Sequence, residues 1–135
     1  MARFTDQVLI VTGAAAGIGR AAALKLAAEG ASVFLTDVAA EGLEETAKLA
    51  GEAATASGGH IESSVSDISD EAQAKASVAA CIDAFGKLDT LCNNAGIIGY
   101  RNTHEMDFAF WRKVMSVNVD GTFLMTREAL PHLIE

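Results

Sequence analysis

Short apolar runs alternate with longer helix-favouring segments along this chain. The apolar runs predict strands, because four to six hydrophobic residues bounded by turn residues are typical of buried strands. The third run is the most polar, which suits the edge of a sheet. The predicted strands are Val8–Thr12, Ser32–Thr36 ending at Asp37, Ile61–Val65 and Leu88–Cys92.

The segments between these strands have helical character. Gly30 and Gly86 are placed to end two of them, and Ser69 is placed to cap the start of the third. Val78, Ile82 and Phe85 recur at helical spacing on that third helix. The predicted helices are Ile18–Glu29, Glu41–Ala56, the segment between Ser69 and Gly86, Asp107–Met115 and Val119–Leu133.

Strands that alternate with helices predict an α/β fold with a parallel sheet and right-handed crossovers. The 135 residues are enough for one domain with a buried core, and no linker or low-complexity stretch divides them. The net charge of −8 argues against a nucleic-acid partner. No run reaches membrane-spanning length and the start lacks a signal-peptide pattern, so we expect a cytoplasmic protein without a membrane partner.

Cysteine and histidine give no sign of a metal site. Cys81 and Cys92 have no metal-ligand spacing and are predicted to be reduced residues of the core. His60, His104 and His132 are scattered along the chain and form no recognisable triad or cluster. We therefore expect no metal.

The most informative motif is T-G-A-A-A-G-I-G at Thr12–Gly19, which directly follows the first apolar run. A strand, a glycine turn and a helix start in that order bring backbone N–H groups and the helix dipole to a nucleotide phosphate. Gly13 allows a tight turn, Gly17 close approach of a diphosphate, and Gly19 close packing of helix on strand. A plain flexible loop is the alternative, which the flanking strand and helix disfavour.

Asp37 closes the second predicted strand, 18 residues after Gly19. In a dinucleotide-binding fold this carboxylate accepts hydrogen bonds from the adenosine ribose and repels a 2′-phosphate, which favours NAD over NADP. No arginine or lysine stands beside it in the sequence, because Val38 follows it and alanines fill the glycine loop. An ordinary exposed aspartate at the end of a strand is the alternative.

Two further segments lie at predicted strand ends. Asp67 follows the third strand, where it can bind the adenine amino group, or act as a turn residue before Ser69, or do both. Asn93-Asn94-Ala95-Gly96 follows the fourth strand and supplies polar groups and close backbone approach where a cofactor lies. A plain turn is the alternative for this second segment.

Taken together, these motifs resemble the classical short-chain dehydrogenase/reductase family. The resemblance extends over the whole chain and includes Ser66-Asp67-Ile68, Gly86-Lys87-Leu88-Asp89 and Asn118-Val119-Asp120-Gly121-Thr122-Phe123. It implies a Rossmann-type doubly wound parallel sheet of strand order 3-2-1-4, forming a single NAD-binding domain over residues 1–135 that stops before a fifth strand. It also implies hydride transfer between nicotinamide and a small secondary alcohol or carbonyl substrate.

The resemblance implies a set of site residues as well. Asn118 corresponds to the family's catalytic asparagine, which supports a proton-relaying water. The residues implied to bind NAD are Thr12, Gly13, Ala16, Gly17, Ile18, Gly19, Asp37, Val38, Asp67, Ile68, Asn94, Ala95 and Gly96.

The family's catalytic serine and Tyr-x-x-x-Lys have no counterpart in these 135 residues. Tyr100 is the single tyrosine, and His104 stands where the lysine would be, so Tyr100 is predicted to be a substrate-loop or surface residue. We expect the chain to bind cofactor, with its own activity in doubt. A non-catalytic adenine-nucleotide binding module, or a methyltransferase-like binder, remains the alternative.

Self-association is also expected. The segment Val119–Leu133 carries Phe123, Leu124, Leu130 and Leu133, and in the family the corresponding helix packs against a twofold mate. The strand Leu88–Cys92 would have a free edge, which favours pairing between chains. The alternative is that the last helix folds back over this strand and covers both surfaces.

Overall fold

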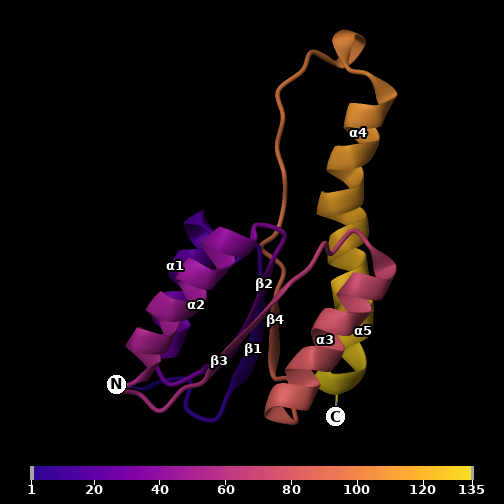
Figure 1. Ribbon diagram of the computed structural model, residues 1–135. Coiled ribbons are helices and arrows are strands. Elements are labelled where there is room, and N and C mark those ends of the chain that lie inside the picture. Colours follow the sequence, from indigo (N-terminus) through magenta and orange to yellow (C-terminus); the bar gives the residue numbers. More distant parts are fainter. Residues whose placement is uncertain (1, 135) are drawn as a thin grey trace.

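The structure, a computed structural model, describes residues 2–134 and contains a parallel four-stranded sheet between two layers of helices (Figure 1). The strand order is β3-β2-β1-β4, as predicted. The strands are β1 (Val8–Thr12), β2 (Ser32–Asp37), β3 (Ile61–Val65) and β4 (Thr90–Cys92). The helical elements are α1 (Gly17–Ala28), α2 (Ala40–Ala54), α3 (Glu71–Phe85), η1 (Thr103–Glu105), α4 (Phe108–Met115), η2 (Ser116–Gly121) and α5 (Thr122–Leu133).

Alternate residues of the central strands face the two helical layers. In β1, Leu9 and Val11 pack with the α1 and α2 layer, whereas Val8 and Ile10 pack with the α3 and α5 layer. A sheet covered on both faces needs apolar residues at every position, which is why β1 reads as an unbroken apolar run. All of β1 is buried.

The two outer strands differ from the central pair. β3 pairs with β2 and is largely exposed, which confirms the polar edge strand expected from the sequence. β4 pairs with β1 and begins two residues later than predicted. Asp89 accepts a hydrogen bond from the Val8 N–H at 2.8 Å with its carboxylate, and its own N–H donates to the Val8 carbonyl at 2.9 Å. Leu88 is buried against α3 and α5 instead of extending the strand.

The start of α3 also differs from the prediction. Asp70, not Ser69, is the N-cap, and its carboxylate accepts the Gln73 N–H at 2.9 Å. The Ser69 hydroxyl donates to Asp67 at 2.6 Å instead. Both residues are good caps by type, so the sequence did not distinguish them.

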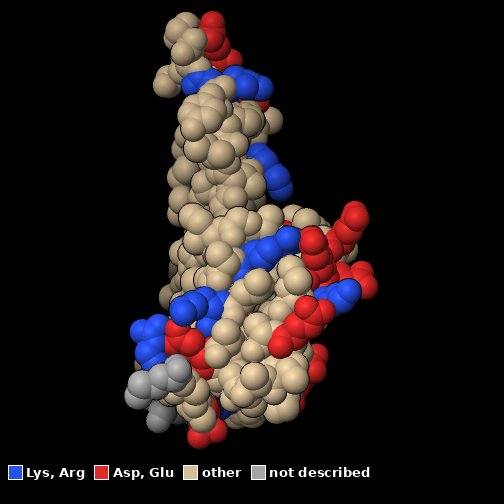
Figure 2. Space-filling model, turned by 90° about the vertical axis from the view of Figure 1, so that its left-hand side faces the viewer, with Lys and Arg blue, Asp and Glu red and all other residues tan. Residues whose placement is uncertain are grey.

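One long helix replaces the two separate helical segments predicted after residue 106. α4 and α5 are joined without a break by the π-helical turn η2. Figure 1 shows α4 projecting past the sheet, and the projecting column in Figure 2 carries few charged side chains. No helix within residues 2–134 has the length and apolar character needed to cross a membrane.

The inner face of α5 packs beside α3 in the helical layer that covers one face of the sheet. Leu124, Met125 and Ala129 are buried there, and Arg127 pairs with Glu71 of α3 at 2.8 Å. Phe123 and Leu130 remain exposed on the outer face. The terminal helix therefore lies over a face of the sheet and leaves apolar side chains on its outer face exposed.

The two cysteines are free thiols in this fold. Cys81 is buried in the core between α3 and the sheet, and burial raises its pKa to about 12. Cys92 is half-buried at the end of β4. Neither is arranged with other ligands as a metal site would require, since no three His, Cys, Asp or Glu side chains gather within residues 2–134.

Candidate functional site

The carboxyl ends of the four parallel strands surround a cavity of about 230 Å³. This is the edge of an open α/β sheet at which ligands bind, because strand ends and helix starts meet there. Residues of the turns after β1, β2, β3 and β4 all reach it. The predicted residues that line the cavity are Gly13, Asp37, Val38, Asp67, Ile68, Ala95 and Gly96.

Close contacts explain two of the glycines in the loop after β1. A Cβ on Gly13 would lie 2.8 Å from the Ala95 Cα, and Gly13 has a φ of +67°. A Cβ on Gly19 would lie 2.2 Å from the Gly13 carbonyl oxygen. The loop folds this tightly only because both positions lack a side chain.

Gly17 is surrounded by open space. Its φ is +56°, and within the described chain no atom outside its immediate neighbours lies within 4 Å of a Cβ built there. Ala16, at the N-cap of α1, has no side chain that could accept a backbone hydrogen bond. The first N–H groups of α1 are therefore left for an external acceptor, and Ile18 beside them is 81% exposed.

Thr12 and Asn94 join the turn after β1 to the turn after β4. The Thr12 hydroxyl accepts the N–H groups of Asn94 at 3.1 Å and of Ala95 at 2.9 Å. The Asn94 side-chain amide donates to the carbonyls of Thr12 at 3.0 Å and Gly13 at 3.2 Å. These two residues shape the cavity from outside its lining.

The Asp37 carboxylate is fixed at both oxygens. Oδ2 accepts the Ala15 N–H at 3.0 Å and Oδ1 accepts the Ala39 N–H at 2.9 Å. The residue is half-buried and faces the cavity. Each carboxylate oxygen has a second acceptor position, so Asp37 can still accept hydrogen bonds from a ligand.

Asp67 makes the turn before Ser69 that was one of the two interpretations of the sequence, and it also lines the cavity. Its Oδ1 accepts the N–H of Ser69 at 2.9 Å and the hydroxyl of Ser69 at 2.6 Å, which makes a local turn. Hydrogen bonding from the Ser69 hydroxyl lowers the pKa of Asp67, and the positive charge of Lys113 lowers it further. The carboxylate is thus held ionised while the residue lines the cavity.

Asn118 lies in η2, on the far side of the loop that follows β4. Its Oδ1 accepts the Ile97 N–H and its Nδ2 donates to the Ile97 carbonyl, both at 2.8 Å. Gly96 passes close by, since a Cβ there would lie 3.3 Å from Asn118 Oδ1. Asn118 therefore fixes the path of the loop against the long helix. Tyr100, further along this loop, is 84% exposed.

Comparison with known proteins identifies this arrangement. The family model for the short chain dehydrogenases matches residues 7–135. The chain belongs to this family. The assignment confirms the resemblance predicted from the motifs at Thr12–Gly19 and Asn93–Gly96.

Among curated members of the short chain dehydrogenase family, levodione reductase from Leifsonia aquatica is 46% identical over 129 residues, covering 95% of this chain and 48% of its own length. A 2-(R)-hydroxypropyl-CoM dehydrogenase from Xanthobacter autotrophicus is 40% identical over 132 residues, covering 96% of this chain and 52% of its own length. The chain therefore spans about half the length of the curated relatives it matches.

Solved structures of the same family have the same fold. The crystal structure of levodione reductase matches with a TM-score of 0.90 at 43% identity, covering 96% of this chain and 50% of that one. A xylitol dehydrogenase with bound NAD⁺ matches with a TM-score of 0.91 at 32% identity, covering 98% of this chain and 50% of that one. The Rossmann-type order predicted for the sheet is thus the order found in these relatives.

Sequence reasoning missed several residues of the cavity. Thr36 and Ser66 immediately precede the two predicted aspartates, so strand-end position could have indicated them. Ile97, Lys113 and Val117 also line the cavity, and they come from the loop and the long helix that cross it. Lys113 shares the cavity with Asp37, so the fold brings a cation to this cavity although no arginine or lysine stands beside Asp37 in the sequence.

Proposed function

We propose that the cavity binds the adenosine part of NAD, and that the chain is the cofactor-binding region of a dehydrogenase or reductase acting on a small secondary alcohol or ketone. The observation that carries this proposal is the position of Asp37, anchored by two backbone N–H groups beside the glycine loop and lining the cavity. Family membership supports the class of reaction. A relative of the same family is described with NAD⁺ bound.

The residues present fit the diphosphate of such a cofactor. The open space around Gly17 admits a phosphate close to the backbone, where a larger side chain would fill it. The N–H groups at the start of α1 have no side-chain cap and carry the positive end of the helix dipole. Thr12, Gly13, Ala16, Ile18 and Gly19 shape this turn.

The residues also fit an adenosine. Asp67 lies ionised at the cavity wall and can accept a hydrogen bond from the adenine amino group. Val38 and Ile68 offer apolar surface to the two faces of the base. Ala95 and Gly96 form the wall on the side of β4 and would bring backbone close to the cofactor, with Asn94 holding this turn from outside the lining.

Asp37 accounts for the proposed preference for NAD. A carboxylate about 4 Å from a 2′-phosphate would cost about 4 kcal/mol at an effective dielectric near 20, which favours NAD by about a thousandfold. Lys113 lies in the same cavity and its charge acts on Asp67. We therefore assign the selection of the ribose to Asp37 and place Lys113 at the adenine end.

Bound NAD would supply C4 of its nicotinamide as the acceptor or donor of hydride. Within residues 2–134, Asn118 is the proposed catalytic residue, following its correspondence to the family's asparagine. Its amide already holds both backbone groups of Ile97, so it would act by fixing the loop and a water beside it. The reaction's remaining groups are not assigned to residues of this chain.

Calorimetry with NAD, NADP and S-adenosylmethionine tests the proposal. We expect NAD to bind and NADP to bind far more weakly. Equal binding of NAD and NADP would overturn the role of Asp37. Preference for S-adenosylmethionine would overturn the cofactor assignment and favour a methyltransferase-like binder, and absence of binding by all three would remove the nucleotide function.

We also propose that the chain self-associates through the outer face of the long helix. The apolar residues exposed along it are Phe108, Trp111, Val119, Phe123, Leu130 and Ile134. Phe108 and Trp111 stack with ring centroids 5.8 Å apart, which joins them into one apolar surface. An exposed helix face of this kind favours a second copy as its partner.

A further inference from the structure

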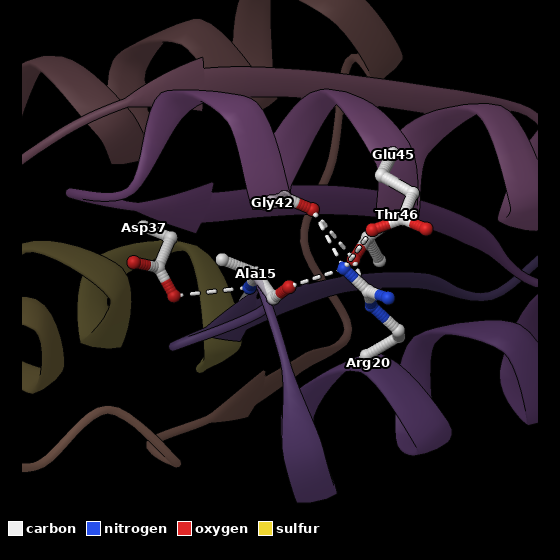
Figure 3. A network of polar contacts seen from close by, with 6 residues as sticks. All are labelled: Ala15, Arg20, Asp37, Gly42, Glu45 and Thr46. Atoms are coloured by element: carbon white, nitrogen blue, oxygen red, sulfur yellow. Dashed lines mark hydrogen bonds and ion pairs between the residues drawn. The ribbon is translucent and has the colours of Figure 1, made fainter.

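Arg20 connects the glycine loop to α2 through one guanidinium group, as Figure 3 shows. Its Nη2 donates to the carbonyl of Ala15 at 2.6 Å and to that of Gly42 at 3.2 Å. The same nitrogen pairs with Glu45 at 2.8 Å, and Nε donates to the hydroxyl of Thr46 at 2.8 Å. Four groups from two elements thus hold one side chain in place.

Ala15 is held from its other side by Asp37. Its N–H donates to Asp37 Oδ2 at 3.0 Å, so Asp37 binds the N–H of Ala15 while Arg20 binds its carbonyl (Figure 3). Gly42 packs against it as well, since a Cβ there would lie 2.9 Å from the Ala15 carbonyl oxygen. The position of Ala15 therefore depends on Arg20 and on the close approach of α2.

We propose that Arg20 is a positioning residue for nucleotide selection: by fixing Ala15, it fixes the carboxylate of Asp37. This inference rests on the proposed function of the cavity. The loop Ala14–Ala16 has only methyl side chains. Those of Ala14 and Ala15 pack in the core, so any hydrogen bond that orients this loop through a side chain comes from outside it. When Arg20 is removed, Ala15 turns, its N–H leaves Asp37, and the carboxylate can move away from a 2′-phosphate.

The charge of Arg20 does not serve a 2′-phosphate directly. Its guanidinium lies behind Ala15, outside the cavity lining, and is paired with Glu45. The contacts of the guanidinium occupy Nε and Nη2, which leaves Nη1 as its remaining donor group, and its charge is already paired with a carboxylate. Arg20 thus brings a cation near the nucleotide loop without favouring NADP.

The alternative is that Arg20 only stabilises the packing of α1 against α2. The two roles use different contacts of the same side chain. The contacts to Gly42, Glu45 and Thr46 join the helices, whereas the contact to Ala15 reaches the loop. Thr46→Val removes one helix contact and leaves the loop contact, so it is the matched control.

The experiment measures the dissociation constants of NAD and NADP for the 135-residue chain and its variants by calorimetry, with thermal melting as the check on folding. Arg20→Met is expected to lower the ratio of the NADP constant to the NAD constant by about tenfold. Thr46→Val is expected to lower the melting temperature and leave that ratio within about twofold. Arg20→Lys, which keeps the charge and one donor group, is expected to restore part of the ratio.

A folded Arg20→Met variant with an unchanged ratio of NADP to NAD dissociation constants would overturn the inference. Arg20 would then only link α1 to α2. If Arg20→Met does not fold, Gly42→Ala decides, because it displaces Ala15 while keeping Arg20. A lowered ratio in Gly42→Ala supports the inference and an unchanged ratio overturns it. If the unchanged chain binds no NAD, both the proposed function and this inference fail. If it binds NAD but Arg20→Met leaves the NADP/NAD ratio unchanged, this inference alone fails.

Discussion

Thr12 accepts two hydrogen bonds from Asn94, one at its side chain and one at its backbone. The Asn94 N–H donates to the Thr12 hydroxyl at 3.1 Å, and the Asn94 side-chain amide donates to the Thr12 carbonyl at 3.0 Å. Because the same hydroxyl also accepts the Ala95 N–H, one side chain satisfies two backbone donors. This links the turns after the neighbouring strands β1 and β4, both of which contribute residues to the cavity lining.

Removing that hydroxyl is expected to destabilise the fold. Thr12→Val keeps the shape of the side chain. It leaves the Ala95 N–H without its acceptor and the Asn94 N–H with the Cys92 carbonyl alone, which should lower the free energy of unfolding by about 2 kcal/mol. Thr12→Ser keeps the hydroxyl and is the control. Urea unfolding compares them, and a valine variant as stable as the serine variant would contradict the assigned role.

Two glycines should respond in opposite directions to the same substitution. Gly19→Ala places a Cβ 2.2 Å from the Gly13 carbonyl, so it should lower the free energy of unfolding by about 2 kcal/mol. Gly51→Ala, in α2, meets open space and should raise it by about 0.5–1 kcal/mol. Thermal unfolding measures both. A Gly19→Ala variant with the same melting temperature as the unchanged chain would contradict the close packing of position 19 against the Gly13 carbonyl.

Glu29 should make stability depend on pH below about 4.5. Hydrogen bonds from Arg3 and then Lys25 lower its pKa from 4.5 to about 2 in the folded chain. A carboxyl with a lowered folded pKa stabilises the fold above its unfolded pKa, and that contribution is lost as pH falls toward the folded value. Glu29→Gln should therefore be less stable than the unchanged chain at pH 7, with the difference narrowing between pH 4.5 and pH 2.

Denaturant unfolding across that pH range is the measurement. Glu52→Gln is the control, because Glu52 is an exposed carboxylate on α2. Its stability difference from the unchanged chain should stay nearly constant with pH. A Glu29 variant whose deficit persists undiminished at pH 2 would contradict the assigned ion pairs.

The strands were predictable because the residue types along each strand reflect how deeply that strand is buried. β1 and β3 have the bounds predicted from the sequence. β1 is apolar because both of its faces are buried, whereas β3 is polar because it lies largely exposed at the edge. The end of β4 was predictable and its start was not, because Asp89 replaces part of the ladder with a side-chain contact to Val8. The π-helical turn at Ser116–Gly121 has no sequence signature that separates it from ordinary helix.

The candidate site was predictable where strand position determines it. Asp37 and Asp67 follow strands, so both were expected at the carboxyl edge, and both line the cavity. Lys113 could not be found this way, because it reaches the cavity from a helix that only the tertiary fold brings there. The contacts of Arg20, which lies within the predicted helix Ile18–Glu29, could not be predicted because its partners in α2 lie more than 20 residues away in sequence.

The outer face of α5 should mediate self-association. Sedimentation over a range of concentrations is expected to give a dimer or larger species, compared with a chain mass of 14.0 kDa. Phe123→Ser should shift the distribution toward monomer, because Phe123 is 59% exposed at the centre of this face. Val65→Ser, on the opposite edge of the sheet, should leave it unchanged. A monomer at every concentration would contradict the prediction.

The central claim is that NAD binds at the carboxyl edge of the sheet, and site-resolved NMR tests it most directly. A titration of the isotopically labelled chain with NAD should move the backbone amide signals of Gly17, Val38 and Ile68 together, with one binding constant. Residues remote from the cavity, such as Gly51, should not respond. Saturating NAD that leaves those three signals unmoved, or that moves only signals of the loop around Tyr100, would contradict the account.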